Sequence, residues 1–370
     1  GQAPLDHADY LYFNCTCRSL WSPIFYVEEV DKPMLLISVV ISAYNAKKFI
    51  QKCVKYYMDQ TYPNIELILF DDASTDDTRE LMFQAQKEYP NKIRVFWSDV
   101  NLGPGGRKDA GKNQAKVEYI IFGDCDDPVE TDYIENLVKT ALENDMPDLV
   151  IGGFKKVTPN HDVIYERVVK DKEDALFQSI TNCGKLFKTS FLRGNDLNLP
   201  KGKVLEDVIF QGCVIVRNPS VAVCLKSGYH YLRNPESFSN NDLNRFVPNS
   251  LENEILALSE NYLKLTSQTA KELFLYYVFR CVCWHLLKSG CGVGKDAMSY
   301  EYQLAFSALD NNFSGYKRCK FISLIRPKHE RLLIRLVVGS IAILHKLHLS
   351  KLFFSLYARL KILKKLWPDM

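Results

Sequence analysis

The chain has 370 residues, of which 47% are apolar and 25% charged. This composition is typical of a globular protein and excludes disordered and fibrous classes. The net charge is only +3, and residues 331–370 carry eight Lys and Arg against one acid, so the rest of the chain is slightly acidic. An acidic body argues against nucleic acid as a partner, whereas the basic end predicts contact with an anionic surface.

Short apolar runs alternate with helical patterns between residues 35 and 153. The patterns predict strands over residues 35–42, 66–70, 93–97, 118–122 and 148–152, and helices over residues 46–60, 76–89, 103–116 and 132–144. This alternation predicts an α/β fold with a mainly parallel sheet. The segments then become short and irregular to about Asn234, and helical patterns dominate from Leu251 onward.

Polar and acidic side chains follow three of the predicted strands, at residues 42–45, 71–74 and 124–127. In open α/β sheets the carboxyl ends of the strands converge on one crevice, where ligands bind. Carboxylates crowded at residues 124–127 raise one another's pKa unless a cation neutralises them, and Mg²⁺ or Mn²⁺ takes such oxygen ligands together with substrate phosphates. The alternative for these residues is a solvated acidic turn that precedes the next helix.

Taken together, the chain resembles family 2 glycosyltransferases of the GT-A fold over residues 35–240. The matching motifs, in the family's order, lie at residues 36–46, 59–66, 71–76, 101–106, 118–127, 182–187, 205–208 and 229–237. The resemblance implies a Rossmann-like mixed sheet flanked by helices that binds a nucleotide sugar. It also implies an inverting hexosyl- or N-acetylhexosaminyltransferase of the kind that builds bacterial capsules, lipopolysaccharides and other glycans.

The resemblance implies donor-binding roles for a group of residues. They are Ser42, Tyr44, Asn45, Asp72, Arg107, Lys108, Asp124 and Arg233. The first three match the motif that lines the nucleotide pocket, and Asp72 matches the aspartate that contacts the base. The family commonly has Ala-Arg-Asn where this chain has residues 107–109, so Lys108 stands at the position of the arginine. Because lysine is a point charge rather than a bidentate fork, either Arg107 or Lys108 is a candidate for the diphosphate.

The resemblance also implies a divalent metal, Mn²⁺ or Mg²⁺, on the donor diphosphate. Asp124 matches the aspartate that faces the ribose and Asp126 the one that binds the metal, with Asp127 as an adjacent candidate ligand. His230 is a further candidate, since some relatives complete the metal shell with a histidine in a similar context. A packed or hydrogen-bonded histidine is the alternative there. Arg233 matches a loop motif that would reach the diphosphate when the loop closes.

Asp207 is the candidate general base. Inversion at the anomeric carbon needs one base opposite the leaving diphosphate to take the proton of the acceptor hydroxyl, and the resemblance assigns that role to Asp207. Glu206 is then structural or faces the acceptor. An acidic first turn of a helix over residues 207–216 is the alternative for both carboxylates.

The basic end of the chain contains an amphipathic pattern. In residues 351–365, Lys351, Ser355 and Arg359 recur at steps of four, and we expect them on the face opposite a set of apolar side chains. That set is Leu352, Phe353, Leu356, Leu360 and Leu363. A helix of this kind lies on a membrane surface, which suits an enzyme that acts on lipid-linked glycans, or docks on the catalytic domain with its basic side in solvent.

We therefore expect an N-terminal extension or linker over residues 1–34, a catalytic domain over 35–240, a helical extension over 241–330 and a basic helical tail over 331–370. The expected protein is cytoplasmic, or peripheral at the cytoplasmic face of the membrane through residues 345–370. It would use a UDP-sugar donor and a glycan or lipid-linked glycan acceptor. A phosphohydrolase is disfavoured because Ser42 stands where its nucleophilic aspartate would be. A catalytically inactive scaffold or glycan-binding module remains the alternative.

Overall fold

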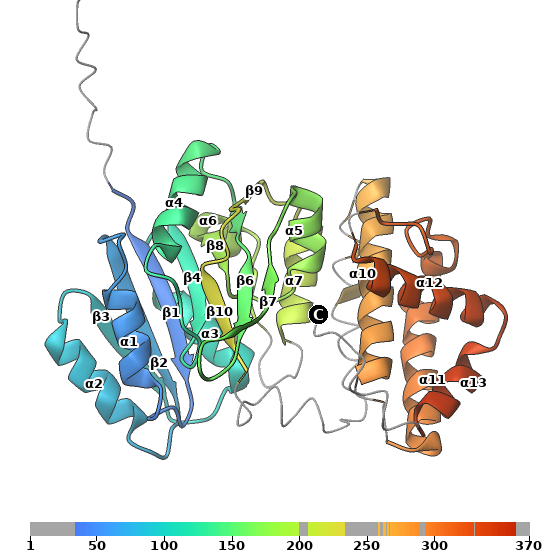
Figure 1. Ribbon diagram of the computed structural model, residues 1–370, viewed down its shortest axis with the longest axis horizontal. Helices are drawn as coiled ribbons and strands as arrows, with labels where there is room; N and C mark the ends of the chain where they lie inside the picture. Colours follow the sequence, from blue (N-terminus) through green and yellow to red (C-terminus); the bar gives the residue numbers. More distant parts are fainter. Residues whose placement is uncertain are drawn as a thin grey trace, which may run out of the picture. The chain divides into compact units, whose positions relative to one another are not determined.

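The computed structural model describes residues 34–199, 206–233, 258–259, 262–263, 265, 267–288, 290, 293–328 and 330–359. The chain divides into two units, Gly1–Met34 and Leu35–Met370, and all helices and strands given below belong to the second. Figure 1 shows the strands of this unit layered with helices, followed by a set of helices from the later part of the chain.

The main sheet has seven strands in the order β3-β2-β1-β4-β8-β5-β9. They are β1 (Ile37–Ala43), β2 (Ile65–Asp72), β3 (Ile93–Ser98), β4 (Tyr119–Asp124), β5 (Leu149–Ile151), β8 (Lys185–Lys188) and β9 (Val221–Val223). All described pairings are parallel except those of β8, which runs antiparallel to both β4 and β5. A second sheet, in the order β10-β6-β7, contains β6 (Phe154–Val157), β7 (Val163–Arg167) and β10 (Tyr229–Leu232). The prediction of a mainly parallel sheet is confirmed.

Strand β1 lies inside the sheet between β2 and β4 and is buried along its whole length, as a mainly apolar strand with both faces covered requires. Because side chains alternate along a strand, Val39 and Ile41 enter one core with residues of α1 (Ile50–Met58), α2 (Thr78–Glu88) and α4 (Tyr133–Glu143). Val40 enters the opposite core with residues of α6 (Thr189–Gly194) and α7 (Glu206–Val216).

Helix α3 (Gly103–Gln114) approaches the sheet closely because it is rich in glycine. A Cβ at Gly111 would lie 2.5 Å from Val40 Cγ1, so any other residue would push α3 away from β1. Lys108, Asp109 and Lys112 of α3 are buried as well. Lys112 pairs with Asp109 at 2.7 Å and donates to the carbonyl of Leu197 at 2.7 Å. The helix is thus held between the sheet and the segment after α6.

The later helices form a core with α7. They are α10 (Gln268–Lys288), α11 (Lys295–Asn312), the 3₁₀ turn Ser314–Arg318, α12 (Leu332–Lys346) and α13 (Ser350–Tyr357). Helix α10 is fixed to the preceding part by Tyr277, whose hydroxyl donates to the carbonyl of Val208 at 2.6 Å, and by Arg280, which donates to the carbonyl of Phe177. Phe177 lies on α5 (Lys172–Gln178). Within the described residues, each helix is too short or too polar to span a membrane.

Two predictions need correction. The first helix begins at Ile50, not Ala46, because the amide of Ala46 is held by Thr78 Oγ1 at 2.7 Å and a turn precedes the helix. In α13, Leu352 and Leu356 of the predicted apolar face are exposed, as Lys351 is, because Phe354 and Tyr357 take the inward positions in the core. Leu360 and Leu363 of the predicted apolar face lie outside the described residues.

Candidate functional site

The loops after β1 and β2 are joined by hydrogen bonds. Asn45, which has a left-handed φ of 50°, accepts a bond from the amide of Thr75 through Oδ1 at 2.8 Å, and its own amide donates to Ser74 Oγ at 2.9 Å. Tyr44 is exposed beside it, and Ser42 is buried at the end of β1. The predicted nucleotide-pocket residues therefore lie together at the carboxyl ends of neighbouring strands.

Asp72 connects β2 to the start of α3. Its two carboxylate oxygens accept the amides of Leu102 at 2.7 Å and Gly103 at 3.1 Å. Burial raises the pKa of Asp72, although these amides and the charge of Arg107 oppose the rise. Asp72 therefore stabilises the glycine-rich turn at the start of α3, next to the predicted donor pocket.

Lys108, which is buried, forms an ion pair with the partly exposed Asp124 at the end of β4. The Nζ of Lys108 lies 3.0 Å from Asp124 Oδ1, and the side chain of Lys108 is 4% exposed. Burial alone would lower the pKa of Lys108, but Asp124 and Asp207 outweigh burial and raise it well above its usual value. Burial acts to raise the pKa of Asp124, but Lys108 and Arg107 lower it. Both members of the pair are therefore charged near neutral pH.

Asp207 lies in the first turn of α7, and Asn182 donates a hydrogen bond from Nδ2 to its Oδ1. Lys185, fully buried in β8, donates at 2.7 Å to Gln211 Oε1, one helical turn beyond Asp207. Burial raises the pKa of Asp207, while the charges of Lys108 and Lys185 hold it down. The carboxylate is thus oriented by an amide, and its charged form is favoured by Lys108 and by Lys185, whose own pKa burial lowers to about 7.

Two members of this arrangement, Asn182 and Lys185, were not predicted as site residues. Both belong to the motif at residues 182–187. The sequence signal that could have identified them is the presence of a polar residue and a lysine beside the apolar strand residues of that motif. Burial also raises the pKa of Glu206 to about 7, with Asp207 adding to the rise and Lys108 opposing it.

The predicted metal ligands are not brought together as a set. Asp127 is buried and accepts bonds from the hydroxyl of Tyr229 and, at 2.8 Å, from the amide of Leu232. His230 Nε2 lies 2.9 Å from Glu130 Oε1, and burial lowers its pKa in spite of that carboxylate. Among the described residues, no group of three or more His, Cys, Asp and Glu side chains could hold a metal ion alone.

Asp126 remains in a position to take part in a metal site. It lies, partly exposed, in the turn that directly follows β4. Magnesium and manganese commonly use one or two carboxylates and complete their shell with substrate phosphates and water. The residues at the end of β4 therefore fit a metal held jointly with a diphosphate, and do not form a complete protein cage.

Among the polar atoms that are buried without a hydrogen-bond partner in the described part of the chain, several lie around this end of the sheet, including Ser42 Oγ, Arg107 Nε and Asn182 Oδ1. Buried polar groups are nearly always hydrogen-bonded in proteins. Their grouping near Asp124 and Asp207 is what a site for a polar ligand would produce. Arg233, at the end of β10, is exposed, and the loop motif that follows it lies outside the described residues.

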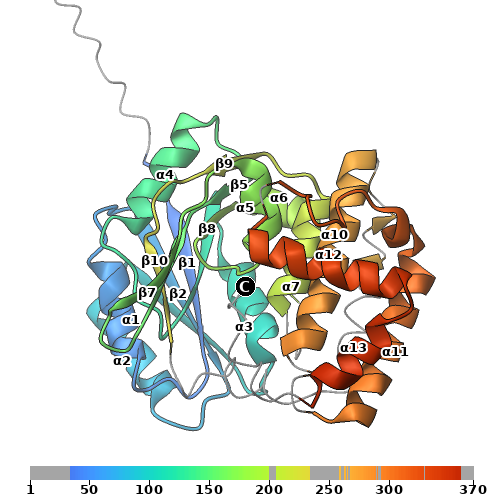
Figure 2. The same ribbon diagram turned by 45° about the vertical axis from the view of Figure 1, so that its right-hand side comes forward.

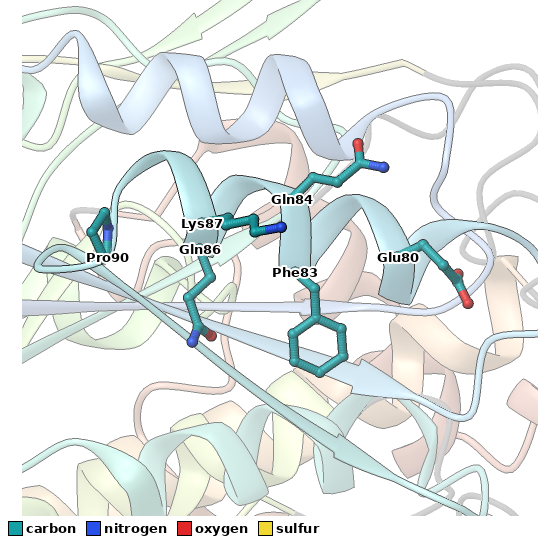
Figure 3. Close-up of a pocket in the computed structure, with 6 residues that line it drawn as sticks. All are labelled: Glu80, Phe83, Gln84, Gln86, Lys87 and Pro90. Atoms are coloured by element: carbon teal, nitrogen blue, oxygen red, sulfur yellow. The ribbon is translucent and has the colours of Figure 1, made fainter.

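A groove on the outer side of α2 is a different feature (Figure 3). Its lining residues are Glu80, Phe83, Gln84, Gln86, Lys87 and Pro90. All of them come from one helix and the turn after it, so groups from separate elements do not converge there as they do around Asp124. The groove is not the candidate active site.

Comparison with known proteins identifies the domain. Residues 38–193 match the family model described as glycosyl transferase family 2. These residues form a family 2 glycosyltransferase domain. Glycosyltransferase GlyG of Streptococcus pneumoniae is 41% identical over 119 residues, which are 32% of this chain and 39% of GlyG. A poly(ribitol-phosphate) beta-glucosyltransferase of Bacillus spizizenii is 28% identical over 53% of this chain and 32% of its own length.

The chain thus spans well under two thirds of these curated relatives. A crystal structure of TarS from Staphylococcus aureus in complex with UDP-GlcNAc matches 85% of this chain and 92% of that chain, with a TM-score of 0.65 and 17% identity. A likeness at this identity concerns the fold, and it agrees with the GT-A architecture predicted for the glycosyltransferase domain. A share of 85% is larger than the glycosyltransferase domain, so the match extends into the region after it.

Proposed function

We propose that this chain is a metal-dependent, inverting glycosyltransferase that moves a sugar from a UDP-sugar to a hydroxyl group of a glycan or lipid-linked glycan. The observation that carries the proposal is the convergence of Lys108, Asp124 and Asp207 within a family 2 glycosyltransferase domain. One side of this group would face the donor and the other the acceptor. The presence of UDP-GlcNAc and UDP in TarS crystal structures supports UDP as the nucleotide.

Asp207 would act as the general base. In the reaction, the acceptor oxygen forms a bond to the anomeric carbon on the side opposite the diphosphate, and its proton passes to the Asp207 carboxylate. The bond from the anomeric carbon to the diphosphate oxygen breaks, and its electron pair leaves with UDP. Burial strengthens Asp207 as a base because it raises the pKa, and Asn182 fixes the direction in which the carboxylate points.

The donor side would be formed by cations and one metal ligand. Arg107 would satisfy its unpartnered Nε on the nucleotide sugar, and Lys108 would hold Asp124 ready for the ribose. Asp126 would hold Mn²⁺ or Mg²⁺, with Asp127 and His230 as further candidates. The bound metal would supply positive charge that stabilises the leaving diphosphate.

Measuring turnover of the donor distinguishes this proposal from the alternative of a catalytically inactive glycan-binding module. The full chain is incubated with Mn²⁺ and, in turn, UDP-Glc, UDP-Gal, UDP-GlcNAc and UDP-GalNAc, and both the melting temperature and UDP release with added glycan acceptors are measured. We expect one donor at about 100 times its Kd to stabilise the fold by roughly 2.7 kcal/mol in a Mn²⁺-dependent way, and to release UDP. Donor binding without turnover would identify an inactive module, and no donor binding at all would contradict the proposal.

The proposal includes peripheral attachment at the cytoplasmic face of a membrane through residues 345–370, which suits a lipid-linked acceptor. Support comes from the eight Lys and Arg of residues 331–370, since anionic lipids attract such segments. Deleting residues 345–370 should weaken binding to anionic vesicles. Turnover of a water-soluble acceptor should be retained by the shortened chain.

A further inference from the structure

The outer side of α12 is apolar although the helix is already packed on its inner side. Val338, Ile341 and Ala342 enter the core shared with α10, α11 and α13. A Cβ at Gly339 would lie 2.8 Å from the backbone of Leu324, so this side of the helix touches the segment before it without space to spare. The attachment of α12 to the protein is therefore made by one side of the helix.

The other side carries five large aliphatic side chains that are between 40% and 61% exposed. They are Leu332, Leu333, Leu336, Ile343 and Leu347. Their spacing places them along one side of the helix, with Ser340 between them. Leu349, Leu352 and Leu356 extend the exposed aliphatic surface onto the following turn and α13. We call these eight residues the aliphatic face, and exposed apolar side chains gathered on one segment in this way mark an interaction site.

The charge of the segment selects the partner. From Arg331 to Arg359 the sequence contains no Asp or Glu. Exposed cations accompany the aliphatic side chains at Lys346, Lys351 and Arg359. Two more arginines are used within the protein, since Arg331 lies over the ring of Tyr165 and Arg335 donates to backbone carbonyls. A segment with exposed aliphatic side chains, exposed cations and no carboxylate of its own is complementary to an anionic lipid surface, where the apolar groups enter the headgroup boundary.

We propose that the aliphatic face of α12 and α13 docks the protein onto an anionic lipid bilayer. Figure 2 shows α12 crossing in front of α10 with α13 below it, so both helices lie on one outer side of the helical core. The proposal deepens the proposed function and rests on it in one respect, the purpose of docking, which is to meet a lipid-linked acceptor. It extends the contact beyond the tail of residues 345–370. Half of the aliphatic face, Leu332, Leu333, Leu336 and Ile343, lies in α12 before that tail.

The test uses the full chain and sedimentation with vesicles of phosphatidylcholine containing phosphatidylglycerol. Leu336→Glu with Ile343→Glu places two charges in the aliphatic face, and Leu142→Glu is the matched control, because Leu142 is a similarly exposed leucine on α4. Circular dichroism confirms folding of each variant. We expect the double variant to lose at least about tenfold in vesicle partitioning and the control to bind as wild type does.

Loss of the cations gives an independent measure. Lys346→Gln with Lys351→Gln should reduce partitioning by roughly fivefold per cation at low salt, and pure phosphatidylcholine vesicles should bind wild type more weakly. Equal partitioning by wild type and the Leu336/Ile343 double variant would overturn the proposal. So would self-association of wild type that the double variant abolishes while neither binds vesicles, because the face would then belong to a second copy. Wild type and both double variants should bind UDP with Mn²⁺ equally, and absence of UDP binding in all three would count only against the proposed function.

Discussion

Replacing Glu206 with glutamine tests the electrostatics of the site through stability. Glu206 lies in the first turn of α7, and burial raises its pKa from 4.5 to about 7. Between these values the unfolded chain ionises Glu206 while the folded chain keeps it protonated. The folded state therefore binds more protons, and the free energy of unfolding falls as the pH rises through this range. The two pKa values correspond to a loss of on the order of 3 kcal/mol by pH 8.

Glutamine has no such titration, so Glu206→Gln should remove this loss. We expect the stability of the variant relative to wild type to increase by on the order of 3 kcal/mol between pH 5 and pH 8, measured by urea unfolding at both values. Glu80→Gln is the control, because Glu80 occupies the first turn of α2 and is exposed. A difference between Glu206→Gln and wild type that is the same at both pH values would refute the reasoning.

Three further predictions concern the donor site, the base and the fold. Asp126→Ala should abolish Mn²⁺-dependent UDP binding measured by calorimetry, whereas the exposed Asp132→Ala should not; undiminished binding by folded Asp126→Ala would remove it from the site. Lys185→Met removes a cation that holds down the pKa of Asp207, so the acid limb of the kcat profile should move to higher pH, and an unmoved limb would exclude this influence. Gly111→Ala should destabilise the protein by roughly 1–3 kcal/mol in urea unfolding, because its Cβ meets β1. Gly194→Ala has open space, and an equal cost in both variants would contradict the packing argument.

The first half of the domain was predictable because its periodicity is strong. Strand β1 is apolar apart from Ser38 and Ser42, and the strand–helix alternation that follows it specifies a parallel sheet by local pattern alone. The antiparallel insertion of β8 between β4 and β5 was not predictable in this way. Strands of three or four residues, such as β5 and β8, carry too little periodicity, and their pairing is decided by partners far along the chain.

The sequence predicted which residues belong to the site better than it predicted their contacts. Motif order pointed to Asp124, Asp126 and Asp207, and the structure places Asp124 and Asp207 around the same lysine. The sequence does not say which way the side chain of His230 points. In the structure its ring contacts Glu130. In α13 the helical period was read correctly. The buried side of α13 is set by the packing of Phe354 and Tyr357 against other helices. The local sequence of α13 does not contain that information.

The most direct measurement of the central claim compares Asp207→Asn with wild type in kcat and in UDP affinity. If Asp207 takes the acceptor proton only as the new bond forms, its loss removes a transition-state interaction and leaves donor binding in place. We expect kcat to fall by roughly 10²–10⁴-fold with the UDP dissociation constant changing less than about threefold. Asp296→Asn, in the first turn of α11, should keep wild-type kcat. A folded Asp207→Asn protein that retains more than about a tenth of wild-type kcat, with chemistry limiting the rate, would contradict the assignment of Asp207 as the base.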